Sequence, residues 1–147
     1  MRLKIIDEPF GQGLKTLQAI AKDAIAIELK GKWVEAPSKY TLQLGVDKHL
    51  EPSDQLWAMI NHSCDPNLWV DAQSLAMVAK RDIAAGEALT FNYLTTEWDM
   101  AEPFSCQCGT KHCFGNISGA RYLEIPQRNE CSSWIFGNAQ AALEELK

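Results

Sequence analysis

Three cysteines in the second half of the chain are close enough in sequence to bind one metal ion. They form the pattern C-x-C-x4-C: Cys106, Cys108 and Cys113. Thiolates at this spacing suit a soft cation such as Zn²⁺, which takes four ligands in structural sites. Cys64 or Cys131 could supply the fourth thiolate, whereas His112 directly precedes Cys113 and would strain to share its metal. The alternative is that these cysteines are small buried apolar residues.

The composition is that of one soluble globular domain. The chain has 147 residues, of which 46% are hydrophobic and 22% charged, and this usage differs from that of disordered and fibrous proteins. Its net charge of −5 is not the basic excess expected of a nucleic-acid-binding protein. We therefore expect no direct binding to nucleic acid, and a basic peptide is the more suitable partner.

The sequence also indicates where the protein works. Charged residues interrupt the apolar stretch at the start of the chain, and no stretch approaches the roughly 20 apolar residues of a membrane span. Without a secretory signal, the five cysteines favour free thiols or metal ligands over disulfides. We expect an intracellular protein with no membrane contact, cytoplasmic or, in a eukaryote, nuclear.

Short strands joined by short turns are the predicted elements. Residues 24–29 and 33–34 read as a β-hairpin around the glycine turn 30–32, and residues 75–79 and 88–93 read as two further strands. Ser53 or Asp54 is placed to cap a short helix through residues 56–59, and residues 139–147 have the content of a terminal helix. The chain is therefore predicted to be mostly β.

Four segments, in order, resemble the SET-domain lysine methyltransferases. Residues 61–67 (NHSCDPN) look like the family signature NHSCxPN, and residues 82–93 (DIAAGEALTFNY) are similar to its I-x-x-G-E-x-L-T-F-D-Y segment, with Asn92 in place of Asp. Residues 104–117 resemble the post-SET zinc knot, and residues 11–14 (GQGL) resemble the N-terminal G-x-G-L turn. The match covers about residues 8 to 120, and four motifs together are far more specific than any one of them.

The resemblance implies an architecture. It predicts a mostly β SET-domain β-clip of small curved sheets, with a C-terminal pseudoknot and a short C-terminal helix. Residues 1–103 would form the SET domain, residues 104–120 the post-SET zinc-binding segment and residues 121–147 a C-terminal extension. In this family the cysteine of NHSC is the fourth zinc ligand. Structural zinc would then be bound by Cys64 with the three clustered cysteines, and Cys131 would be an unpaired thiol.

The resemblance also implies an activity, the transfer of methyl groups from S-adenosylmethionine to a lysine side-chain amine. Tyr93 would be the catalytic tyrosine, and Phe91 and Tyr40 would line the substrate channel. Phe91 has no hydroxyl to hold a water, which predicts di- or trimethylation. Desolvation and the sulfonium charge both favour the neutral amine, so no strong general base is required. The expected cofactor contacts are Gly11, Gln12, Gly13, Asn61, His62, Tyr93 and Phe104.

Departures from the family leave the substrate open. Residues 58–60 are Ala-Met-Ile where many members have Arg-Phe-Ile, and the stretch between Tyr40 and Trp57 is short. The substrate could be a protein lysine, in a basic segment such as a histone tail, or a non-protein amine. The rival function is a non-catalytic, zinc-stabilised binding module. A nucleic-acid-binding zinc domain is disfavoured by the net charge.

Overall fold

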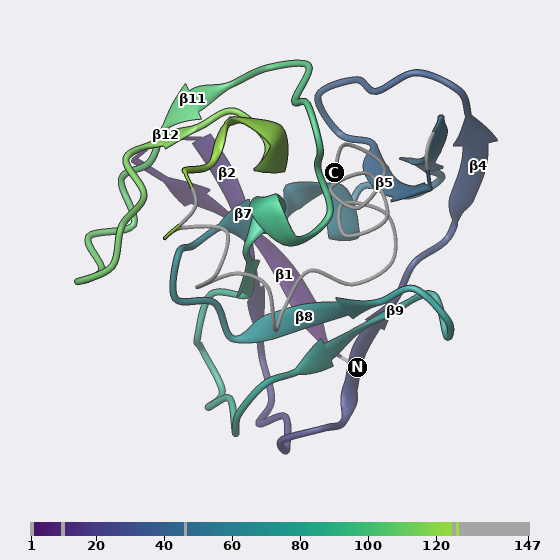
Figure 1. The fold of residues 1–147 in the computed structure, drawn as a ribbon. Helices are drawn as coiled ribbons and strands as arrows, with labels where there is room; N and C mark the ends of the chain where they lie inside the picture. Colours follow the sequence, from purple (N-terminus) through teal and green to yellow (C-terminus); the bar gives the residue numbers. More distant parts are fainter. Residues whose placement is uncertain (1, 10, 46, 125, 127–147) are drawn as a thin grey trace.

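The computed structural model describes residues 2–9, 11–45, 47–124 and 126. Within these ranges the chain forms short strands grouped in five small sheets and three short 3-10 turns. Figure 1 shows the small sheets arranged around β7 (Asn61–His62) near the middle of the molecule. This architecture confirms the prediction of a mostly β fold built from small sheets. None of the described helices is long and apolar enough to cross a membrane.

The first sheet is the hairpin of β1 (Leu3–Glu8) and β2 (Gly11–Thr16). Its antiparallel register pairs Glu8 with Gly11 at the tight end. β2 carries the glycine motif at that end, and Leu14 on the same strand is fully buried in the main core. Gly11 and Gln12 are thus held at the rim of the molecule by a strand whose other end is buried.

Two three-stranded sheets form most of the remaining body. One has the order β3 (Ile25–Glu28), β9 (Ala76–Ala79), β8 (Leu68–Asp71), and the other has the order β4 (Gly31–Val34), β6 (Lys48–Pro52), β5 (Leu42–Gly45). All neighbours in these sheets are antiparallel.

The predicted hairpin over residues 24–34 is wrong, although both of its strands form. β3 pairs with β9, and β4 pairs with β6. The reason lies in Gly31, which is not a turn residue: a Cβ atom there would lie 2.1 Å from the backbone oxygen of Glu51. The glycine allows β6 to approach closely, while the Leu29 amide bonds to the carbonyl of Leu75 in the other sheet. The chain therefore passes from one sheet to the next instead of folding back.

The second predicted strand pair forms in shortened versions. Residues 75–79 become β9, and residues 88–93 contribute only β10 (Thr90–Phe91), which pairs in parallel with β7. The register sets Thr90 opposite Asn61 and Phe91 opposite His62. This pairing brings the NHSC run beside the run that contains Tyr93, from which it is separated by some thirty residues.

The remaining described elements are short. The predicted helix near residue 57 is the 3-10 turn η1 (Trp57–Met59), and the Asp54 carboxylate accepts the Leu56 amide just before it. η2 (Tyr93–Thr95) follows β10, β11 (Phe104–Ser105) pairs with β12 (Asn116–Ile117), and η3 is Ala120–Tyr122. The predicted helix over residues 139–147 lies outside the described residues, and the pseudoknot stays a prediction.

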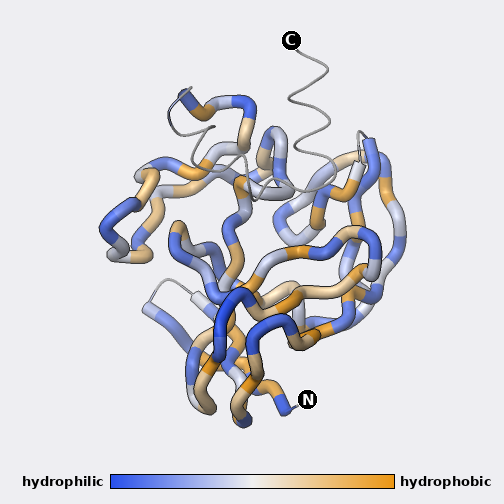
Figure 2. Tube along the Cα trace, turned by 60° about the horizontal axis from the view of Figure 1, so that its bottom comes forward, coloured by the Kyte–Doolittle hydropathy of each residue, from blue (hydrophilic) through white to orange (hydrophobic). Residues whose placement is uncertain are grey.

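Two hydrophobic clusters stabilise the fold. The larger lies between the sheets and includes Leu14, Ile60 and Met77, while the smaller surrounds the cysteines and includes Leu94 and Ile117. Figure 2 shows hydrophobic and hydrophilic residues alternating along the described chain, as expected for short strands with one buried face. Tyr93 packs against both clusters. The side chain singled out by the sequence thus lies where the two cores meet.

Gly119 offers a test of how the C-terminal part of the described chain is held. Its φ is +128°, and an added Cβ would lie 2.3 Å from the Trp98 backbone oxygen. We predict that Gly119→Ala lowers the free energy of unfolding by roughly 2–4 kcal/mol, from backbone strain plus overpacking. Urea denaturation measures this loss. Gly86→Ala is the control, because Gly86 has φ +92° with nothing within 4 Å of its Cβ position. Equal losses in the two variants would contradict the close contact.

Candidate active site and metal centre

Two cavities meet at Tyr93. The wider has a volume of about 480 Å³ and runs along Gly11, Asn61, His62 and Phe104. The narrower has a volume of about 50 Å³ and is bounded by Phe91, Ile60 and Glu97. Six residues line both cavities and form the wall between them: Lys39, Tyr40, Ala58, Tyr93, Met100 and Glu102. A space for a large ligand and a space for a slender group therefore adjoin a single tyrosine.

Local structure fixes the position of Tyr93. The Asn92 side chain accepts the Leu94 amide and so begins η2 at Tyr93. The Tyr93 hydroxyl donates to the Ile60 carbonyl at 2.6 Å. Burial raises the pKa of Tyr93, with Glu97 and Tyr40 acting in the same direction, so the phenol is protonated at neutral pH. Its hydrogen is directed at Ile60, which leaves the oxygen lone pairs available to a ligand.

The glycine motif and Asn61 form one rim of the wide cavity. The Asn61 amide donates to the Gln12 carbonyl at 3.0 Å, and Gly11 and Gln12 line the cavity. Gly13 lies behind them, where a Cβ would come within 3.0 Å of the Asn61 amide nitrogen. Gly13 therefore contributes by letting Asn61 pack against β2, and its predicted contact with a cofactor stays untested.

His62 connects the tyrosine to the cysteines. Its Nδ1 accepts the Tyr93 backbone amide at 3.1 Å, and its Nε2 lies 3.2 Å from the sulfur of Cys64. Burial lowers the pKa of His62 to about 4, so the ring is neutral at pH 7. A neutral ring that accepts at Nδ1 carries its hydrogen on Nε2. The imidazole therefore donates to the Cys64 sulfur.

Aromatic rings line the junction of the cavities. The ring centroids of Phe91 and Tyr93 are 4.7 Å apart, and Phe104 makes edge contacts with His62 and Tyr93 at 5.8 and 5.9 Å. Phe104 is partly exposed at the mouth of the wide cavity, and Tyr40 is partly exposed where the two cavities join. The structure thus brings together the predicted channel residues, Phe91 and Tyr40, with the predicted catalytic tyrosine.

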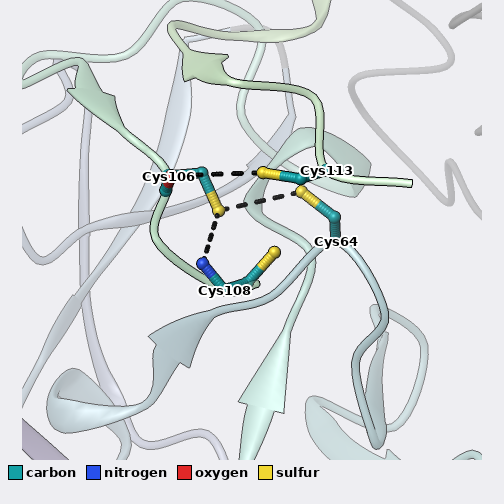
Figure 3. Close-up of side chains that lie close together, drawn as sticks. All are labelled: Cys64, Cys106, Cys108 and Cys113. Atoms are coloured by element: carbon teal, nitrogen blue, oxygen red, sulfur yellow. Dashed lines mark hydrogen bonds between the residues drawn. The ribbon is translucent and has the colours of Figure 1, made fainter. Parts of the chain in front are cut away.

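Four cysteines converge beside this site (Figure 3). The sulfur atoms of Cys64, Cys106, Cys108 and Cys113 all lie within 4.8 Å of one another, and those of Cys64 and Cys106 are 3.8 Å apart. Sulfur atoms about 2.3 Å from a tetrahedral zinc ion lie about 3.8 Å from each other, so the cluster fits that ion. Cys131 lies outside the described residues.

The surroundings of the cluster suit thiolates held by a cation. The Phe114 amide points at the Cys64 sulfur at 3.3 Å and the Cys108 amide at the Cys106 sulfur at 3.4 Å. Burial raises the pKa of the Cys64 thiol, and a divalent cation reverses this tendency because metal-bound thiols are deprotonated. All four candidate ligands among the described residues are cysteines, which is the ligand set of a structural zinc centre.

Glu97 is a site residue that the sequence analysis missed. It is 8% exposed and lines the narrow cavity, and its Oε2 accepts the Gln43 amide and the Thr96 hydroxyl, both at 2.8 Å. Burial raises the pKa of Glu97 to about 7. No local pattern in the sequence marks it, because its burial depends on Gln43, more than fifty residues away.

The comparisons with known proteins agree with this geometry. The sequence model of the SET domain matches residues 11–94, more than half of the chain. The chain belongs to the SET-domain family. The predicted resemblance is therefore confirmed, and the NHSC run and Tyr93 both fall inside the matched range.

Curated relatives are named as methyltransferases. The chain is 35% identical over 120 residues to "Methyltransferase flvH" of Aspergillus flavus, covering 79% of this chain and 66% of that protein. It is 44% identical over 70 residues to an H3 lysine-36 specific histone-lysine N-methyltransferase of Aspergillus oryzae, covering 44% of this chain and 7% of that protein. The chain thus spans less than two thirds of the length of either relative.

Solved structures confirm the fold. A crystal structure of KRYPTONITE in complex with mCHG DNA and SAH superposes with a TM-score of 0.63 at 19% identity, covering 78% of this chain and 28% of that one. A second, with mCHH DNA, an H3(1–15) peptide and SAH, gives a TM-score of 0.60 at 20% identity, covering 78% and 29%. At this identity the likeness concerns the fold alone.

The raised pKa of Glu97 predicts how stability depends on pH. The folded chain keeps a proton on Glu97 that the unfolded chain releases above its ordinary pKa of 4.5. The stabilisation is therefore complete below pH 4.5 and is lost as pH rises through about 7. A shift of this size corresponds to on the order of 3 kcal/mol.

Glu97→Gln keeps an acceptor oxygen and removes the titration. Wild type should therefore be more stable than the variant at pH 4, and this advantage should shrink by roughly 3 kcal/mol between pH 4 and pH 8. Urea denaturation across that range measures the free energy of unfolding of both proteins. Glu28→Gln is the control, because the Glu28 side chain is 69% exposed. A difference for Glu97→Gln that does not change with pH would contradict the buried titration.

Proposed function

We propose that the protein is an S-adenosylmethionine-dependent methyltransferase that transfers methyl groups to the side-chain amine of a lysine in a protein. The observation that carries the proposal is that a wide and a narrow cavity are both lined by Tyr93. In-line methyl transfer requires a donor and an acceptor to approach one point from two sides. A single wall shared by two cavities suits that requirement.

The wide cavity would take S-adenosylmethionine. Its polar groups come from Gln12, Asn61 and the backbone of β2, and its aromatic cover comes from Phe104. A zwitterionic, nucleoside-bearing ligand needs both kinds of surface. Both superposed KRYPTONITE structures were determined with SAH, which supports assigning this family's methyl donor to the wide cavity.

The narrow cavity would take the lysine side chain. Methyl transfer needs a neutral amine, whereas free lysine has a pKa of about 10.4. Burial among Phe91, Ile60 and Tyr93 disfavours the ammonium, and the positive sulfonium would add repulsion. The Tyr93 oxygen, fixed by its bond to Ile60, would stabilise the polarised methyl group as it moves to nitrogen.

A lysine within a basic peptide is the substrate that best fits an acidic chain. The net charge is −5, and Glu102 lies on the wall between the cavities. One superposed KRYPTONITE structure contains an H3 peptide, and a relative is named for histone H3 lysine 36. The chain covers a small part of both proteins, so a histone tail stays one candidate among lysine-bearing peptides. Absence of nucleic-acid binding and an intracellular location stay predictions.

The cysteine cluster would bind one structural zinc ion. Four thiolates close the coordination sphere, so the ion would stabilise the fold without contacting substrate. It would join the NHSC run to the post-SET segment over residues 104–120, while residues 1–103 form the SET domain. Two observed contacts lie where these segments meet: the hydrogen bond from the Phe114 amide to the Cys64 sulfur and the pairing of β11 with β12.

Tyr93→Phe tests the enzymatic proposal. The variant keeps the ring contacts and loses the hydroxyl, so methyl transfer should fall about 100-fold with little change in stability. Labelled S-adenosylmethionine and a panel of lysine peptides, histone tails included, would be used with the purified chain. Tyr122→Phe is the matched control, since its hydroxyl bonds to Asp99 away from both cavities.

The outcomes separate the candidate functions. Binding of S-adenosylmethionine without transfer would favour a non-catalytic binding module, and transfer only to free amines would exclude a protein substrate. Equal rates for wild type and Tyr93→Phe would remove the tyrosine from its role. Mass spectra of the product also test the prediction from Phe91, which expects two or three methyl groups.

Cys64→Ser tests the zinc proposal. We expect about one zinc ion per wild-type chain, loss of most of it in the variant, and a lower unfolding temperature, because the cluster keeps only three thiolates. Elemental analysis and thermal melting provide the readouts. Cys131→Ser is the control, since it is the other cysteine that the sequence allows as a fourth ligand. Loss of zinc from that variant and not from Cys64→Ser would contradict the assignment.

A further inference from the structure

Glu97 is positioned by the same helical turn as Tyr93. The Glu97 amide donates to the Tyr93 carbonyl at 2.8 Å, which is an i to i+4 bond. Both residues line the narrow cavity. The charge of Glu97 also raises the pKa of Tyr93, which indicates that the carboxyl group lies near the phenol.

Only one oxygen of this carboxyl group is used by the fold. Oε2 accepts from the Gln43 amide and the Thr96 hydroxyl, whereas Oε1 has no hydrogen-bond partner within the part of the chain that the structure describes. The Gln43 side chain bonds instead to Gly45 and Trp98. Oε1 is not one of the fully buried polar atoms that lack a partner, so it keeps contact with open space. This oxygen is therefore free to bond to a ligand in the narrow cavity.

The charged groups that line the narrow cavity decide which kind of ligand it favours. The titratable groups that line it with Glu97 are Lys39, Tyr40, Tyr93 and Glu102. The Lys39 ammonium lies over the Tyr40 ring, 5.4 Å from its centroid, and Glu102 is exposed at the rim. Tyr93 is neutral at pH 7, because burial raises its pKa. Glu97 is therefore the acidic group in the buried part of the cavity.

We propose that the free oxygen of Glu97 binds the ammonium of the incoming amine and takes up its proton before methyl transfer, directly or through one water. The proposal rests on the proposed function and adds an acid–base residue to it. The pH-dependent charge of Glu97 supports it, because burial raises the pKa of Glu97 to about 7, which suits a base that works near neutral pH.

The step balances without any further reactant. The ammonium R–NH₃⁺ and the carboxylate give the amine R–NH₂ and the carboxylic acid. The nitrogen lone pair then forms the new bond to the methyl carbon as the bond from that carbon to the sulfonium sulfur breaks, giving R–NH₂CH₃⁺ and the neutral thioether. The acid returns its proton to solvent, and the methylated ammonium can enter a second cycle.

Calorimetry with n-butylammonium, a truncated lysine side chain, tests the proposal on the full chain with and without S-adenosylhomocysteine. Wild type should bind it more tightly as pH rises from 6 to 8. Glu97→Gln should bind it at least 10-fold more weakly, with no pH dependence over that range. The control Glu28→Gln, which removes an equal charge far from both cavities, should match wild type. Equal binding by wild type and Glu97→Gln, or no binding by wild type, would overturn the proposal.

A second measurement needs no variant and so does not depend on whether one folds. Burial raises the pKa of Glu97 to about 7, so near pH 7 part of the Glu97 population carries a proton. Binding the ammonium should release part of a proton, as observed by titration in two buffers of different ionisation enthalpy. Zero release would overturn the proposal.

Enzyme kinetics separate this inference from the proposed function. In Glu97→Gln we expect KM for the peptide to rise and the fall in kcat/KM below pH 7 to disappear. Wild type that binds n-butylammonium with proton release but methylates nothing would refute the methyltransferase and leave the cation site. Wild type that methylates peptides with a pH profile shared by Glu97→Gln would refute the role of Glu97 and leave the methyltransferase.

Discussion

The site depends on one imidazole ring. His62 accepts the Tyr93 amide at Nδ1 and therefore presents an N–H to the Cys64 sulfur. The parallel pairing of β7 with β10 makes both bonds possible, because it sets His62 opposite Phe91 two residues before Tyr93. A protonated ring could not accept from Tyr93, so burial, which keeps the ring neutral, is part of the arrangement. The tyrosine and the cysteine cluster are thereby held in one geometry.

The link from Tyr93 through His62 to Cys64 also bears on the stability of the residues around the two cavities. Sheets of two or three strands are marginal by themselves. Among the described residues, the buried members of the cluster around the cysteines are Cys64, Leu94, Ile117, Ala120 and Leu123. A cation bound by the four sulfur atoms would add stability to this part of the fold. It would also hold β11, and with it Phe104, against His62 and Tyr93. The segment that carries Cys106 and Cys108 therefore also carries Phe104, which lines the wide cavity.

The features that could be predicted from the sequence are those that short motifs specify. The four cysteines, the NHSC run and Tyr93 have residue types that carry chemistry, and they come together as expected. The hairpin over residues 24–34 failed because Gly31 resembles a turn glycine, and only the distant Glu51 backbone reveals its close strand contact. Glu97 was missed for a similar reason. Its burial follows from contacts with Gln43 on β5, more than fifty residues away, which no local pattern encodes.

The burial of Glu97 gives a reason for Asn92, which stands where the family pattern has an aspartate. It is 1% exposed, and its side-chain oxygen accepts the Leu94 amide at the start of η2. An aspartate could make the same bond, but it would bury a second carboxylate on the turn that leads to Glu97. Two buried acids so close in the chain would oppose each other's ionisation. The neutral amide begins the turn without charge, at the cost of a buried amide nitrogen that has no partner among the described residues. The turn after β10 therefore carries one buried carboxyl group, and it faces the narrow cavity.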